Sequence, residues 1–166
     1  VTMKQQVSLE LMEFVERQIL PRYNAFGESH GLRHVTRVIK NSLRLADVTG
    51  ADIDMVYVIA AYHDLGMEGP RAIHHLTSGK ILMADARLKK WFNADQLKVM
   101  KEAVEDHRAS ASHAPRSIYG KIVAEADREM EQVILATFDL NEMQENRLSW
   151  GIFRDRRPEC YGDICK

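Results

Sequence analysis

Apolar residues recur at the helical spacing of three or four positions along most of this 166-residue chain, and no segment alternates with the period of a strand. The longest such stretch, from Ile53 to Leu65, contains the pair Ala60-Ala61, which favours a buried helix over a strand. Asp52 before it and Gly66 after it are typical residues of helix boundaries. The pattern predicts an all-α protein with this helix at its centre.

The same periodicity predicts five further helices, most of them bounded by proline, glycine or polar breaks. They span Met3 to Leu20, His30 to Thr49, His74 to Ala84, Ala94 to His107 and Ser117 to Asn141. No internal repeat, linker or low-complexity tract divides the sequence. We therefore expect a single compact domain over residues 1–166, a bundle of about six or seven helices in which residues 131–166 form a C-terminal helix and tail.

Composition narrows the range of partners. Lys and Arg total 23 against 24 Asp and Glu, and the net charge of -1 provides no broad positive field for a nucleic acid or an anionic membrane. The longest unbroken apolar run, Met55 to Tyr62, is far shorter than the roughly 18 residues of a membrane-spanning helix. Val1 to Gln6 are not followed by the apolar core of a secretory signal. We expect a cytoplasmic protein without nucleic-acid or membrane partners.

The last part of the sequence gives weaker signals. Its two cysteines, Cys160 and Cys165, lie too close together to link distant parts of a core. We expect free thiols, with a local disulfide or half of a metal site as alternatives, and assign them no role. Trp150 and Phe153 offer apolar surface for a homodimer, an expectation that rests on their position alone.

Several predicted helices carry a histidine or an aspartate on the face expected to be buried. Counting in steps of three and four residues places these on such faces: His34, His63, Asp64, His107 and Asp127. A single inward histidine is usually a hydrogen-bonded core residue. A buried carboxylate without a partner, however, costs several kcal/mol. Two inward aspartates with three inward histidines therefore favour a shared explanation, which a metal site provides.

The other histidines divide into two groups. His75 shares a helix face with Gly79 and Leu82 and joins the inward set, whereas His30 and His113 are expected in loops or first helical turns.

These residues make the chain resemble the HD-domain superfamily of metal-dependent phosphohydrolases, whose signature is a His, a distant His-Asp pair and a late Asp. The matching segments read H-G-L-R-H-V-T-R-V at 30–38, H-D-L-G at 63–66 and A-E-A-D-R at 124–128. The resemblance covers about residues 28–130. It implies a helical HD-type domain, and a divalent ion bound by His34, His63, Asp64 and Asp127.

The two-metal branch of that superfamily adds a histidine in H-x-x-x-G and another in A-x-x-x-H. The sequence offers H-L-T-S-G at 75–79 and A-V-E-D-H at 103–107. The resemblance implies that His75, His107 and a bridging Asp64 hold a second ion, with His75 preferred to His74 because of its spacing to Gly79. The chain is similar in this respect to small bacterial HD hydrolases, including those that cleave dinucleoside polyphosphates. It lacks the tandem His-Asp arrangement of guanosine tetraphosphate hydrolases and the Gly-Tyr-Pro extension of cyclic-di-GMP phosphodiesterases.

The implied site has no thiolate ligand, so it suits one or two ions of Fe, Mn, Co, Ni or Zn. A water between two cations loses a proton near neutral pH and becomes a nucleophile, with Asp64 at the catalytic centre. The expected substrate is small, phosphorylated and nucleotide-like. Candidate cations for its phosphates lie within one or two helical turns of the implied ligands: Arg37, Lys80, Arg108 and Lys121. The alternative for each is an ordinary solvent-exposed charge.

Two other functions fit the same ligand set. Some two-metal HD proteins are diiron oxygenases, and a Tyr and a Glu upstream of the first histidine mark one such group. Tyr23 and Glu28 stand nearby, but their spacing to His34 fits poorly. The second alternative is a non-catalytic module that keeps the metal for signalling or ligand sensing.

Overall fold

The computed structural model describes residues 6–108 and 114–136, with side chains described as far as residue 128. The chain divides into two units, Val1–Met130 and Glu131–Lys166, and all described side chains belong to the first. The single domain over residues 1–166 stays a prediction. Residues named from sequence that fall outside the described part are His113, Trp150, Phe153, Cys160 and Cys165.

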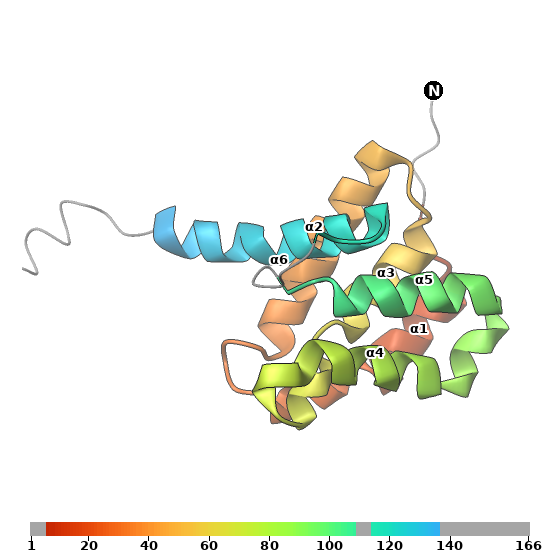
Figure 1. Cartoon of the computed structure of the whole chain (residues 1–166), viewed down its shortest axis with the longest axis horizontal. Helices are drawn as coiled ribbons and strands as arrows, with labels where there is room; N and C mark the ends of the chain where they lie inside the picture. The colour runs from red at the N-terminus through yellow and green to blue at the C-terminus, as the bar shows by residue number, and fades with distance from the viewer. Residues whose placement is uncertain (1–5, 109–113, 137–166) are drawn as a thin grey trace, which may run out of the picture. The chain divides into compact units, whose positions relative to one another are not determined.

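The described residues form α-helices joined by short 3-10 helices and contain no strand (Figure 1), which confirms the predicted all-α class. The α-helices are α1 (Leu9–Gln18), α2 (Leu32–Thr49), α3 (Ile53–Tyr62), α4 (His74–Ala84), α5 (Ala94–Glu105) and α6 (Ile118–Ala136). The 3-10 helices are η1 (Leu20–Ala25), η2 (Leu65–Glu68), η3 (Arg71–Ile73) and η4 (Ala86–Lys90). In this part of the chain, no helix combines the length and apolar character needed to cross a membrane.

The helix α3 forms the centre of the core. Every residue from Met55 to Tyr62 is buried, and α2 and α5 both pack against this helix. The hydroxyl of buried Tyr23 donates a hydrogen bond to the Ala61 carbonyl (2.8 Å) and accepts one from the Asp64 amide (3.3 Å). Burial raises the pKa of Tyr23 well above its usual value, so this hydroxyl keeps its proton. The tyrosine thereby holds the end of α3 in place.

Two predicted helix ends differ from the observed ones in a way that matters for the site. α2 begins at Leu32, after Gly31 as its N-cap, so His30 lies in the turn before the helix. α3 ends at Tyr62 rather than Leu65, and Asp64 leaves the helical conformation with φ -110° and ψ 6°. His30 and Asp64 therefore both project from chain segments that are turning.

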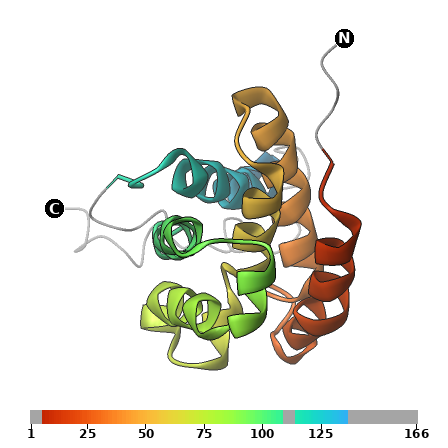
Figure 2. The same cartoon turned by 90° about the vertical axis from the view of Figure 1, so that its right-hand side faces the viewer.

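The start of α6 packs beside α2 and α3. Ile122 belongs to a buried apolar cluster with Ala46, Ala51 and Val56. Figures 1 and 2 show this part of α6 lying across the orange α2. The contact brings Asp127 of α6 toward the first turn of α2, where His34 lies.

Replacing Asp52 with alanine tests the N-terminal end of the central helix. The Asp52 carboxylate accepts hydrogen bonds from the amides of Asp54 (3.0 Å) and Met55 (3.1 Å), as the sequence predicts for an N-cap. Loss of such a cap is expected to lower the free energy of unfolding by about 1 kcal/mol. Chemical denaturation measures the free energy of unfolding. Asparagine at the same position should recover most of the loss, because its side-chain oxygen also accepts hydrogen bonds from these amides.

Candidate metal centre

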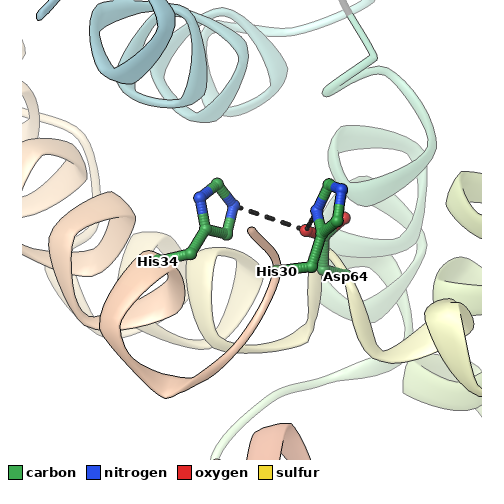
Figure 3. Close-up of side chains that lie close together, drawn as sticks. All are labelled: His30, His34 and Asp64. Carbon is green, nitrogen blue, oxygen red and sulfur yellow. Dashed lines mark hydrogen bonds and ion pairs between the residues drawn. The ribbon is translucent and has the colours of Figure 1, made fainter. Parts of the chain in front are cut away.

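The Asp64 carboxylate lies at the middle of a group of imidazoles. Its Oδ2 is 3.0 Å from His30 Nδ1, 3.3 Å from His34 Nε2 and 3.3 Å from His63 Nε2. Its Oδ1 is 3.4 Å from both His74 Nε2 and His107 Nε2. Figure 3 shows His30 and His34, from the turn before α2 and from its first turn, approaching this carboxylate. Each oxygen of one aspartate thus faces a separate set of ring nitrogens.

A repeated local hydrogen bond orients three of these rings. The Nδ1 atoms of His63, His74 and His107 each donate to the backbone carbonyl three residues earlier, at 2.7, 2.8 and 2.6 Å. The proton on Nδ1 leaves the lone pair of each neutral ring on Nε2, the atom that faces Asp64. This is the arrangement by which an outer hydrogen bond fixes the tautomer of a metal-ligating histidine.

The nitrogen atoms of facing rings are close enough to share a cation between them. His74 Nε2 and His107 Nε2 are 3.2 Å apart, with both Nδ1 protons already directed to carbonyls. Two lone pairs at that distance repel each other. Two ligands that share an ion at about 2.1 Å are separated by roughly 3.0 to 3.4 Å in octahedral or tetrahedral geometry. The donor set therefore fits a divalent ion.

A second such group lies on the other side of Asp64. His34 Nε2 is 3.2 Å from His63 Nε2 and 3.4 Å from Asp127 Oδ1. Ligand atoms within 4.8 Å of one another define three groups able to hold an ion in the described part of the chain: His30, His34 and Asp64; His34, His63 and Asp127; and Asp64, His74 and His107. The Asp127 side chain is 29% exposed and Asp64 only 3%, so the group with Asp127 is the more open to solvent.

The electrostatics of the metal-free centre favour a positive charge beside Asp64. Burial works to lower the pKa of His63, but the Asp64 carboxylate and Asp127 outweigh it and raise this pKa to about 9. Burial also opposes ionisation of Asp64, yet the imidazoles around it hold its pKa well below the usual range. At neutral pH a proton or a metal ion is therefore expected at His63, and metal binding displaces the proton.

The structure brings His74, and not the His75 named from the sequence, to Asp64. His74 and Ser78, on one face of α4, point toward η2 and Asp64, whereas Gly79 faces α5, where an added Cβ would meet the Glu105 side chain. The H-x-x-x-G spacing thus reflects close packing of α4 on α5 and does not identify the ligand. His75 Nδ1 is buried and has no hydrogen-bond partner among the described residues.

Two residues beside Asp64 were not predicted from the sequence to belong to the centre. His30 was expected in a loop or first turn without a role, yet it contacts Asp64 directly. Arg71, which was not singled out, lies with guanidinium Nη2 3.2 Å from His30 Nε2. The spacing H-x-x-x-H from His30 to His34 was the available signal, because a turn followed by a helix start can place both rings on one side.

Of the four cations proposed from sequence, Arg108 lies beside the centre. Its guanidinium donates to the carbonyl of Ala72 in η3, 2.7 Å away, next to Arg71 and His74. The other three are exposed, and no contact with the centre is seen for them: Arg37, Lys80 and Lys121.

Comparison with known proteins identifies the family of this helical domain. The family model described as "HD domain" matches residues 31–129, which include His34, His63, Asp64, His74, His107 and Asp127. The chain belongs to the HD domain family. A crystal structure of a predicted HD superfamily hydrolase from an uncultured Thermotogales bacterium is similar in fold, with a TM-score of 0.59 and 20% identity over 90% of each chain.

Short stretches of this HD-family chain are also similar to parts of an amidase and a citrullinase. One stretch of 47 residues is 51% identical to a citrullinase of Francisella tularensis, and one of 42 residues is 57% identical to an N-carbamoylputrescine amidase of Arabidopsis thaliana. These stretches make up 28% and 25% of this chain but only 16% and 14% of those proteins.

Proposed function

We propose that the protein is a metal-dependent phosphohydrolase that cleaves a phosphoester or phosphoanhydride of a small nucleotide-like substrate. The observation that carries the proposal is the Asp64 carboxylate, whose two oxygens face two separate sets of imidazole nitrogens at 3.0 to 3.4 Å. The centre lies in the segment that the HD domain model matches.

The residues divide into two ligand sets that share Asp64. One ion would be held by His34, His63, Asp64 and Asp127, and the other by Asp64, His74 and His107. Such ions, when bound, supply a deprotonated water near neutral pH and withdraw charge from the phosphoryl oxygens. The carbonyls of Ala60, Arg71 and Val104 accept from the Nδ1 atoms of His63, His74 and His107, and so direct each Nε2 toward the ions.

The exposed side of the centre suits an anionic substrate. Arg108 lies beside η3, and the partner found for its guanidinium, the Ala72 carbonyl, is a neutral group. A phosphate oxygen offers this guanidinium a stronger, charge-assisted hydrogen bond. The Glu68 carboxylate in η2 pairs with Arg22 at 2.7 Å.

The test is a substrate screen with protein loaded separately with Mn, Fe, Co, Ni and Zn. Phosphomonoesters, dinucleotides, cyclic diesters and diphosphates are offered without oxygen, and released phosphate or nucleotide is measured. Turnover under these conditions supports the hydrolase. Strict dependence on oxygen would favour the diiron oxygenase, and full metal occupancy with no turnover of any substrate would favour the non-catalytic module.

Glutamine at position 74, compared with glutamine at position 75, tests the second ligand set. His74→Gln removes an Nε2 that lies 3.4 Å from Asp64 Oδ1 and is expected to leave one ion per chain. His75→Gln changes the adjacent ring, which belongs to none of the ligand groups in the described part of the chain. This variant should keep two ions per chain. Elemental analysis of dialysed protein measures the number of ions bound per chain. Loss of an ion in His75→Gln but not in His74→Gln would favour His75 as the ligand.

A further inference from the structure

His30 differs from the other four imidazoles of the centre in the nitrogen that it presents. The others approach Asp64 through Nε2. His30 approaches through Nδ1, at 3.0 Å from Oδ2, and its Nε2 lies 3.2 Å from Nη2 of Arg71. The ring is thus held between a carboxylate and a guanidinium, while no backbone carbonyl is found to hold it.

Both neighbours of His30 require the same position for its proton. A guanidinium has donors and no acceptor, so His30 Nε2 must accept the hydrogen bond from Arg71. An ionised carboxylate only accepts, so His30 Nδ1 must donate to Asp64. With a proton on Nδ1, this nitrogen has no lone pair to offer a metal ion, although distance alone groups it with His34 and Asp64.

We propose that Arg71 is a positioning residue that fixes the tautomer of His30, so that His30 donates a hydrogen bond to Asp64 and does not bind metal. This inference rests on the metal centre of the proposed function and refines it. His30 then orients Asp64 Oδ2 from outside the ligand set, and the first ion keeps His34, His63, Asp64 and Asp127 as its protein ligands. Arg71 reaches the reaction only through His30 and Asp64.

Arg71 makes two separable contacts with the centre, which gives the test an internal control. Its backbone carbonyl accepts from His74 Nδ1 at 2.8 Å, while its exposed side chain contacts His30. Arg71→Ala removes the second contact and leaves the first. Arg71→Lys keeps a side chain that only donates and serves as the conservative rescue.

Nitrogen NMR of the histidine rings reads the tautomer directly, in metal-free, zinc-loaded and cadmium-loaded protein. In the natural protein we expect His30 to carry its proton on Nδ1 and to accept a hydrogen bond at the unprotonated Nε2. In Arg71→Ala we expect a mixture of His30 tautomers with His74 unchanged, and in Arg71→Lys a return to the Nδ1 form. A natural protein with His30 protonated on Nε2, or with scalar coupling between bound cadmium and His30 Nδ1, would overturn the inference.

Metal affinity gives the second readout. Loss of an outer hydrogen bond to a metal ligand typically weakens metal binding by about 10- to 100-fold. We expect a loss of this size for Arg71→Ala. A competition titration with a chromophoric chelator measures it. Arg33→Ala, which removes an exposed guanidinium next to His34 in sequence, should leave affinity unchanged. Unchanged affinity in Arg71→Ala would refute the positioning role. Neither readout uses phosphate release, so a protein without hydrolase activity would refute the proposed function alone.

Discussion

Asparagine in place of Asp64 is expected to remove both metal ions and to lower kcat/KM at least about a thousandfold, which corresponds to roughly 4 kcal/mol of transition-state stabilisation. Asp64 is the residue shared by both ligand sets, with Oδ2 3.3 Å from His34 and His63 and Oδ1 3.4 Å from His74 and His107. The substitution keeps the shape of the side chain but removes its charge and replaces one oxygen with a donor. Metal content and kcat/KM on the substrate found in the screen measure the result.

Asp127 provides the graded comparison for this result. Its Oδ1 lies 3.4 Å from His34 Nε2, and it belongs to the group with His34 and His63. Asp127→Asn should therefore lose one ion and keep the ion between His74 and His107. Asp47→Asn, at an exposed position of α2, is the matched control and should keep both. Two bound ions in Asp64→Asn would contradict the bridging role of this carboxylate.

The fold could be predicted closely because helical periodicity reports burial directly. The predicted bounds of His74–Ala84 are those of α4, and the predicted last residue of the second helix, Thr49, is that of α2, which Gly50 ends with φ 71°. The 3-10 helices were missed, since three to six residues hold too few turns to show a period. These short elements matter for the centre, because η2 follows Asp64 and η3 carries Arg71.

The centre was predictable where a ligand continues an apolar helix face and unpredictable where it lies in a turn. His34 and Asp127 stand on regular helices and His63 directly follows one, so counting residues places them inward. His74 and His75 differ by one position at the first turn of α4, and only the contact of this turn with η2 decides between them. The role of Arg71 depends on a tertiary contact 41 residues away in sequence, which no local pattern contains.

Alanine in place of Gly66 is expected to lower the free energy of unfolding by about 4 kcal/mol, at the severe end for single substitutions. The backbone of α4 lies directly over this buried glycine, whose amide donates to Ser78 Oγ at 2.8 Å. An added Cβ would overlap the His74 carbonyl oxygen and lie 2.7 Å from the Ser78 amide nitrogen. Backbone atoms cannot rotate aside, so α4 would have to move. Because α4 begins with His74, folded protein should also lose the ion between His74 and His107.

Gly69→Ala is the matched control for Gly66→Ala because it adds the same methyl group three residues later. Gly69 has extended backbone, φ -115° and ψ -160°, and the nearest atom to its added Cβ is the Gly66 carbonyl oxygen at 3.6 Å, an ordinary contact. The free energy of unfolding of Gly69→Ala should therefore stay within about 0.5 kcal/mol of that of the natural protein. Urea denaturation compares the three proteins, and metal analysis follows on the folded fractions. A Gly66→Ala variant as stable as Gly69→Ala, with two ions bound, would show that α4 does not need this close approach. The glycine of the H-D-L-G motif would then have no packing role in placing His74.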